Sequence, residues 1–167
     1  MADETHRVSF ICAKVDLDMA YPGLVMGWAA LGNGIDGTGL FTFWGMDMMT
    51  KSRQGRLELA PVGKTSMKMS MMGLKTGNLG IPNILGMLPG MTAFATSIMK
   101  KKIAGVGAPP VGEYLQMLVD GGAQLYACKM SVDMMGLKKE DFVDGVIDIV
   151  TASDFMDMTE GAQIIFI

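Results

Sequence analysis

Short apolar segments alternate with segments of helical pattern along most of this chain of 167 residues. Val8–Ala13 is apolar, the stretch from Leu17 to Leu31 has the pattern of a helix, and Leu40–Trp44 is rich in aromatic residues. Strand, helix and strand in this order predict a right-handed βαβ unit and therefore a parallel sheet. No other feature of the sequence constrains the fold as strongly.

The alternation continues in the second half of the chain. We predict an α/β fold in three layers, α/β/α, around a mostly parallel sheet of about five strands. The expected organisation is a single domain over residues 1–167, with a Met- and Gly-rich apolar insertion at about residues 64–99. The remaining predicted helices are Met91–Ile103, Val111–Gly121, Lys129–Met135 and a segment from Thr151 or Ser153 to Thr159; the remaining strands are Ala123–Ala127, Val146–Val150 and Ala162–Ile167, the last closing the chain inside the sheet.

Composition excludes several functional classes. The net charge is −3 and the basic residues form no long run, which argues against nucleic-acid binding. Two cysteines are too few for a disulfide scaffold or a Cys-rich zinc site. The polar, acidic N-terminus differs from the basic start of a signal peptide, so the expected location is cytoplasmic. We expect no cofactor, because the chain has no Gly-rich phosphate-binding fingerprint.

Cys128 stands where a predicted strand meets a predicted helix. In an open parallel sheet, ligands and chemistry gather at the carboxyl ends of the strands. A helix N-terminus presents unpaired N–H groups and a positive partial charge there, which favours a thiolate. Cys128 is therefore the predicted reactive residue; the alternative is an inert thiol in the core, since free cysteine is commonly buried.

Three further residues are candidates for the same site. Cys12 ends the first predicted strand, so it would lie at the same edge of the sheet as Cys128 and is the candidate second thiol; the alternative is a core residue. Lys14 and Lys129 could stabilise a thiolate or an anionic sulfur species, although such lysines are commonly solvated. The only histidine, His6, lies in the polar N-terminal segment, which argues against a His-dependent catalytic dyad or a zinc site.

Two segments suggest other roles. Residues 79–99 carry no charge, and this run is long enough for a membrane span of about 20 residues. Three lysines follow it. Pro82, Pro89 and several polar residues argue for a loop and an amphipathic helix instead, so that residues 79–103 would at most contact a membrane surface or another subunit. The methionines at 67, 69, 71 and 72 could bind Cu(I), but adaptable packing is the more usual role of methionine.

Several motifs occur together in the expected order: Phe10-Ile-Cys-Ala-Lys14, Phe41-Thr-Phe-Trp-Gly45, Leu125-Tyr-Ala-Cys-Lys-Met-Ser-Val-Asp133 and Gly161-Ala-Gln-Ile-Ile-Phe166. As a set they resemble the DsrE/DsrF/TusD family of sulfur-relay proteins, in particular its longer DsrE-like branch. The resemblance extends from about Val8 to Ile167, and the motif around Cys128 is its specific part.

The resemblance implies a compact α/β/α domain that forms homo- or hetero-oligomers, commonly trimers or hexamers, and for this chain we expect a homo-oligomer. It also implies a sulfur carrier or sulfurtransferase in which Cys128 takes sulfane sulfur as a persulfide or thiosulfonate and passes it to a partner. The implied partners are a TusA-like sulfur carrier or a rhodanese-like donor. The alternatives are a partner- or membrane-docking scaffold with an inert cysteine, and a Met-rich Cu(I)-binding protein.

Overall fold

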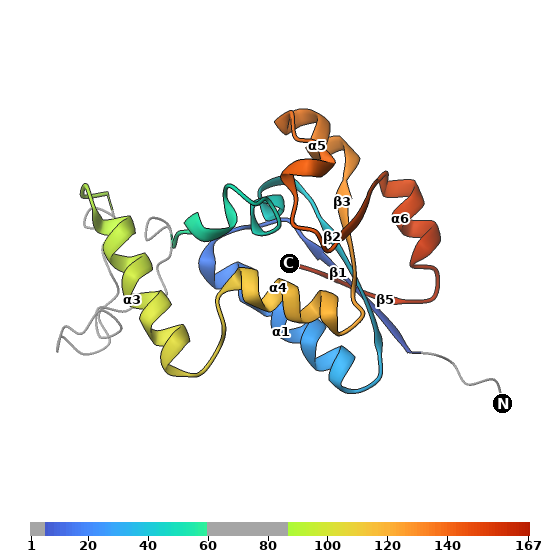
Figure 1. The fold of residues 1–167 in the computed structure, drawn as a ribbon, viewed down its shortest axis with the longest axis horizontal. Coiled ribbons are helices and arrows are strands. Elements are labelled where there is room, and N and C mark those ends of the chain that lie inside the picture. The colour runs from blue at the N-terminus through green and yellow to red at the C-terminus, as the bar shows by residue number, and fades with distance from the viewer. Residues whose placement is uncertain (1–5, 60–86) are drawn as a thin grey trace. The chain divides into compact units, whose positions relative to one another are not determined.

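The structure is a computed structural model that describes residues 6–59 and 87–167. The chain divides into two compact units, one formed by Met1–Leu57 with Pro110–Ile167 and the other by Glu58–Pro109. The first unit contains a parallel sheet of five strands in the order β4-β3-β2-β1-β5 (Figure 1). The parallel α/β prediction is therefore confirmed. The strands are β1 (Arg7–Cys12), β2 (Asp36–Phe41), β3 (Gln124–Cys128), β4 (Val146–Val150) and β5 (Gln163–Phe166).

Helices cover both faces of this sheet. One face packs against α1 and α4, where Leu24 and Leu118 meet Phe10 and Phe41 of the strands. The other face packs against α6, whose Phe155 is buried among Leu40, Tyr126 and Val150. The α-helices of the first unit are α1 (Leu17–Gly32), α4 (Val111–Asp120), α5 (Lys129–Met135) and α6 (Ala152–Met158), and the short 3-10 helices are η1 (Phe43–Met48), η2 (Gln54–Arg56) and η4 (Lys139–Asp141).

Small residues let α1 lie close to the sheet. A Cβ atom on Gly23 would lie 3.0 Å from the Cys12 Sγ atom, and one on Gly27 would lie 3.2 Å from Leu118 of α4. These two glycines are four residues apart, so they lie on the same side of α1. The close approach of α1 is the reason that Cys12 is buried.

The second predicted strand was placed too late in the chain. The structure starts β2 at Asp36 and ends it at Phe41, whereas Phe43 and Trp44 belong to η1. Aromatic residues favour strands, but Phe43 has a left-handed backbone with φ 46°, which an extended strand does not allow. The glycines of Asp36-Gly-Thr-Gly disfavour a strand in isolation, and tertiary packing in the middle of the sheet overrides this preference.

The final strand is also corrected. The chain ends in β5, as predicted, but β5 is an edge strand beside β1 and does not lie inside the sheet. Its residues are mostly exposed, and Phe166 is the most exposed of them among the large apolar side chains. The near-continuous apolar sequence is typical of a buried strand, and only the strand order distinguishes the two cases.

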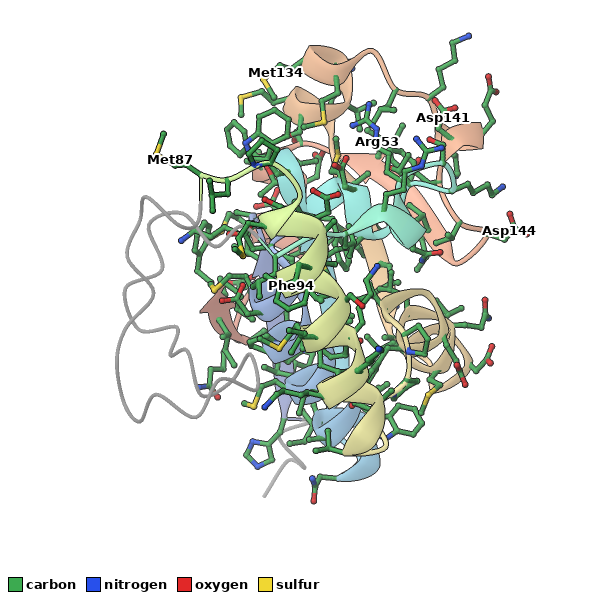
Figure 2. The ribbon with its side chains drawn as sticks, turned by 90° about the vertical axis from the view of Figure 1, so that its left-hand side faces the viewer. Arg53, Met87, Phe94, Met134, Asp141 and Asp144 are labelled. Carbon is green, nitrogen blue, oxygen red and sulfur yellow. The ribbon has the colours of Figure 1, made fainter. Side chains whose placement is uncertain are left out.

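The segment after η1 is fixed by the loop before β4. Thr50 forms an antiparallel bridge with Phe142, and the Val143 N–H donates to the Met49 carbonyl at 2.9 Å. Lys51 pairs with Asp144 at 2.9 Å, and Arg53 pairs with Asp47 at 2.8 Å (Figure 2 labels Arg53 and Asp144). The C-terminal side of η1 is thereby held in place by backbone as well as side-chain contacts.

The second unit contains α3 (Met91–Gly105), which confirms the helix predicted to begin at Met91. Ala95 and Thr96 are its buried residues, and the Thr96 hydroxyl accepts a 2.8 Å hydrogen bond from the Leu59 N–H. Phe94 projects from the exposed side of α3 (Figure 2). The predicted insertion at 64–99 falls in this unit, and its residues 64–86 lie outside the described residues. None of the helices in the described ranges has the length and apolar character needed to span a bilayer.

Gly45 of η1 lies close to the backbone at the end of β1, and replacing it tests this close approach. A Cβ atom at position 45 would lie 2.1 Å from the Cys12 carbonyl oxygen, which is backbone and cannot move aside. We expect Gly45→Ala to lower the free energy of unfolding by about 2–3 kcal/mol, as for overpacked sites. Urea denaturation measures the change. Gly32→Ala is the control, since no atom of the described residues outside its own stretch of helix lies within 4 Å of its Cβ position. An equal loss in both variants would contradict the expectation.

Candidate functional site

Cys128 is the last residue of β3 and the N-cap residue of α5. It lies opposite Val150 of β4, and its side chain belongs to the buried cluster of Leu40, Tyr126 and Phe155. Only 7% of the residue is accessible to solvent. The predicted strand-to-helix turn is therefore present, and its thiol lies at the outer limit of an apolar core.

Cys128 directly precedes the first turn of α5. The first four N–H groups of a helix have no partner within the helix. The Cys128 side chain accepts no capping hydrogen bond from them in the thiol form. These N–H groups and the positive end of the helix would stabilise an anionic sulfur better than a neutral one.

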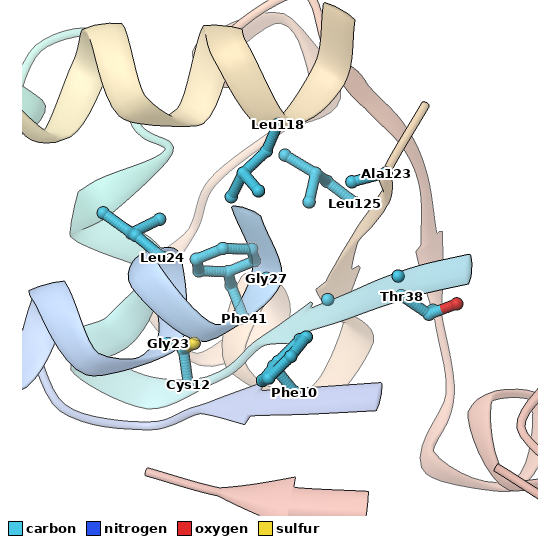
Figure 3. A pocket seen from close by; sticks show the side chains of 12 residues that line it. Phe10, Cys12, Gly23, Leu24, Gly27, Thr38, Phe41, Leu118, Ala123 and Leu125 are labelled. Carbon is cyan, nitrogen blue, oxygen red and sulfur yellow. The ribbon is translucent and has the colours of Figure 1, made fainter. Parts of the chain in front are cut away.

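Cys12 lies in a different environment, a pocket between the sheet and helices α1 and α4 (Figure 3). Phe10, Leu24 and Phe41 surround it, and 5% of the residue is accessible to solvent. This burial raises the pKa of the Cys12 thiol to about 12. The thiol stays protonated at neutral pH, and a protonated thiol is a poor nucleophile.

The two thiols reach the same edge of the sheet but opposite faces. Cys12 pairs with Phe41, and Phe41 pairs with Ala127, so Cys12 shares a face with Ala127. The next residue, Cys128, points to the other face, because side chains alternate along a strand. With β2 between them, the two Cα atoms are separated by about 10 Å, twice the spacing of neighbouring strands. A disulfide requires less than about 7 Å, so the two residues cannot bridge within this chain.

The two candidate lysines are both exposed, and neither touches a cysteine through any contact described here. Lys129 directs its Nζ atom to Asp133, one turn further along α5, at 3.1 Å. Such exposed pairs contribute only about 0.2–0.5 kcal/mol, so Lys129 exchanges readily with solvent. Lys14 lies two residues beyond the end of β1 and is exposed. Their role beside a sulfur anion stays a prediction.

The sequence reading missed a hydrogen-bonded group beside Cys128. The Ser131 hydroxyl, in the first turn of α5, lies 2.9 Å from the Thr42 hydroxyl and accepts the Phe43 N–H at 2.9 Å. The predicted strand Leu40–Trp44 includes Thr42 as an ordinary strand residue, so its hydrogen bond at the end of β2 was not expected. The available signal was Ser131 three residues after Cys128, since this is the position where helix N-termini often carry a polar side chain.

Exposed apolar side chains flank the same edge. Phe43 and Trp44 of η1 are 41% and 61% accessible, and Met130 and Met134 of α5 are more than half accessible (Figure 2 labels Met134). Met130 and Met134 are four residues apart and share one side of α5. We call these four residues the apolar rim.

Metal binding has little support in the described part of the chain. Residues 6–59 and 87–167 contain no cluster of three His, Cys, Asp or Glu side chains suited to a metal ion. The methionines at 67, 69, 71 and 72, considered above as Cu(I) ligands, lie outside the described residues.

This geometry defines a class of protein: a parallel α/β/α protein that holds a single thiol where a strand meets a helix. A model of the DsrE/DsrF/DrsH-like family matches residues 4–167. The sulfur carrier protein DsrE2 of Allochromatium vinosum is 32% identical over 144 residues, which cover 86% of each chain. An uncharacterised protein of Bacillus subtilis, YrkE, is 27% identical over the full length of both chains.

A solved structure supports the same fold. The ychN protein of E. coli superposes with a TM-score of 0.51 at 12% identity, covering 97% of this chain and 99% of that one. The chain therefore belongs to the DsrE/DsrF/DrsH-like family, which confirms the resemblance inferred from its motifs.

The raised pKa of Cys12 predicts a loss of stability in alkali. Between pH 9 and pH 12 the unfolded chain loses this proton while the folded chain keeps it. The contribution of Cys12 to the free energy of unfolding is thus fully present below pH 9 and falls by about 1.4 kcal/mol per pH unit above pH 9. Urea unfolding of wild type and Cys12→Ala from pH 8 to pH 11 measures this effect.

We expect Cys12→Ala to be less stable at pH 8, because it leaves a cavity beside α1. The gap between the two proteins should narrow as the pH rises, since all other titrating groups are shared. A gap that stays constant up to pH 11 would contradict the assignment.

Proposed function

We propose that this protein is a sulfur carrier of a sulfur relay, with Cys128 as the residue that holds the sulfur. The observation that carries the proposal is the position of Cys128 at the N-terminus of α5, at the carboxyl end of β3. The family membership and the 32% identity to a protein named as a sulfur carrier support it.

The chemistry requires one nucleophile and no external oxidant. The Cys128 thiolate attacks the sulfane sulfur of a polysulfide or of a donor's persulfide. A bond forms between the Cys128 Sγ atom and that sulfur, and the bond from that sulfur to the donor breaks. The electron pair leaves with the donor, as a thiolate from a protein persulfide or as a shorter polysulfide anion from polysulfide, and Cys128 holds a persulfide anion. A later thiolate of an acceptor takes the same sulfur by the reverse exchange.

The burial of Cys128 suits this role. A persulfide exposed to solvent is lost to any passing thiol, whereas a site with 7% accessibility admits few attackers. The apolar cluster around Phe155 packs against the Cys128 side chain, and the residue directly precedes the first turn of α5. A small polysulfide or a narrow segment of a partner protein is the donor that such a site accepts.

A partner protein also explains the apolar rim. Phe43, Trp44, Met130 and Met134 expose apolar surface on the two elements next to Cys128. Aromatic and methionine side chains are enriched where proteins contact one another. We propose that a TusA-like carrier or a rhodanese-like donor docks there and presents its own cysteine to Cys128. Self-association into a homo-oligomer is part of the same proposal and is supported by the exposed edge strand β5.

The test is the intact mass of the protein after incubation with polysulfide. We expect wild type and Cys12→Ser to gain sulfur-sized mass increments that dithiothreitol removes, and Cys128→Ser to gain none. Circular dichroism checks that each variant is folded. Cys12→Ser is the matched control, because it removes the other thiol of the chain.

Two outcomes would overturn the proposal. If wild type gains no sulfur from polysulfide or from a protein persulfide, Cys128 is inert and a docking scaffold becomes the better reading. If Cys12→Ser abolishes loading and Cys128→Ser does not, the carrier residue is Cys12.

A further inference from the structure

Two buried hydroxyl groups lie at the junction of β2 and α5. Ser131 is completely buried and Thr42 is 7% accessible, and their oxygen atoms are 2.9 Å apart. The Ser131 oxygen also accepts the Phe43 N–H at 2.9 Å. Phe43 adopts the left-handed backbone that bulky residues rarely take, and this conformation accompanies its bond to Ser131.

The hydrogen bond within this pair uses only one of its two hydroxyl protons. Two hydroxyls carry two protons, and the bond between them uses one. The Ser131 oxygen already accepts the Phe43 N–H, which makes Ser131 the better donor to Thr42, because hydrogen bonds in a chain strengthen one another. The Thr42 proton then has no acceptor among the hydrogen bonds of the described residues. Either hydroxyl can donate across the 2.9 Å bond; with Ser131 as the donor, Thr42 is partnered as an acceptor and keeps one proton for a further acceptor.

The register of the strands places Thr42 beside Cys128. Phe41 and Ala127 are paired, so the residues that follow them, Thr42 and Cys128, end neighbouring strands at the same level. Thr42 keeps an extended backbone, with φ −137° and ψ 159°. Its side chain therefore points to the same face as Leu40, which is the face of the Cys128 cluster.

We propose that the hydroxyl pair of Thr42 and Ser131 donates a hydrogen bond to the anionic sulfur of Cys128. This proposal rests on the proposed function. The Phe43 N–H donates to Ser131, Ser131 donates to Thr42, and Thr42 donates to the thiolate or to the persulfide anion that Cys128 carries. Thr42 is the residue that touches the sulfur anion, and Ser131 is a positioning residue that orients it. Thr42 gains this strong hydrogen bond only when the sulfur is anionic, so the pair stabilises the thiolate or persulfide anion relative to the neutral thiol.

The experiment is the rate of Cys128 alkylation by iodoacetamide as a function of pH, followed on the Cys128 peptide by mass spectrometry. Loss of a hydrogen bond to a charged group predicts that Thr42→Val reacts about tenfold more slowly at neutral pH and shifts the midpoint of the pH profile upward by about one unit. Thr42→Ser keeps the hydroxyl and should retain the wild-type profile. Ser131→Ala should shift the midpoint in the same direction by less.

Ser9→Ala is the matched control. Ser9 lies on the same face of the sheet and is 1% accessible, and its hydroxyl has no hydrogen-bond partner among the described residues, but it lies on β1 away from the carboxyl edge. Its removal should leave the pH profile of Cys128 unchanged. The midpoint is the decisive quantity, because a merely structural role for Thr42 would lower stability without moving it.

The inference is overturned if Thr42→Val keeps the wild-type midpoint, if Thr42→Ser shifts as far as Thr42→Val, or if Ser9→Ala shifts equally. Should Thr42→Val fail to fold, Thr42→Ala replaces it under the same criteria. Alkylation does not involve sulfur transfer, so this result is separate from the loading test. If wild type loads sulfur while Thr42→Val keeps the wild-type midpoint, the proposed sulfur-carrier function stands and the proposed role of the hydroxyl pair is refuted.

Discussion

The parallel pairing of β1, β2 and β3 is the constraint on which the whole site depends. It delivers Cys12, Thr42 and Cys128 to one edge of the sheet, and its register decides which face each side chain takes. A shift of one residue between β2 and β3 would move Cys128 to the side of α1 and α4, away from Thr42. The sulfur chemistry proposed for this protein is thus a property of strand register as much as of residue identity.

The two faces of the sheet create two kinds of thiol from the same residue type. Under α1, where Gly23 lets the helix approach closely, Cys12 is surrounded by carbon and its neutral form is strongly favoured. On the other face Cys128 has an apolar core on one side and a helix N-terminus on the other. The contrast comes from what packs above each sulfur, so two residues of one type lie in two different environments within one chain.

Much of this fold could be predicted from the sequence, because periodicity and helix-end signals are local. The helix Lys129–Met135 and the strand Val146–Val150 have the predicted bounds, and the turn that carries Cys128 is where the pattern placed it. The order of the strands is not local, so the edge position of β5 could not be read from its apolar residues. The face of each cysteine depends on register, and the Thr42–Ser131 bond joins residues 89 positions apart. Ser131 near the helix N-terminus is a partial signal, but neither the face of each cysteine nor the bonding partner of Ser131 can be derived from a single sequence.

The sheet that separates the two cysteines has a consequence for oxidation. Proteins with two thiols at one edge commonly close them into an internal disulfide when the surroundings become oxidising. Here strand β2 lies between the two cysteines, so they cannot form a disulfide within one molecule. Any disulfide formed by Cys128 must join this chain to a separate molecule, so the oxidation of Cys128 depends on which thiol-containing molecules bind at this edge of the sheet.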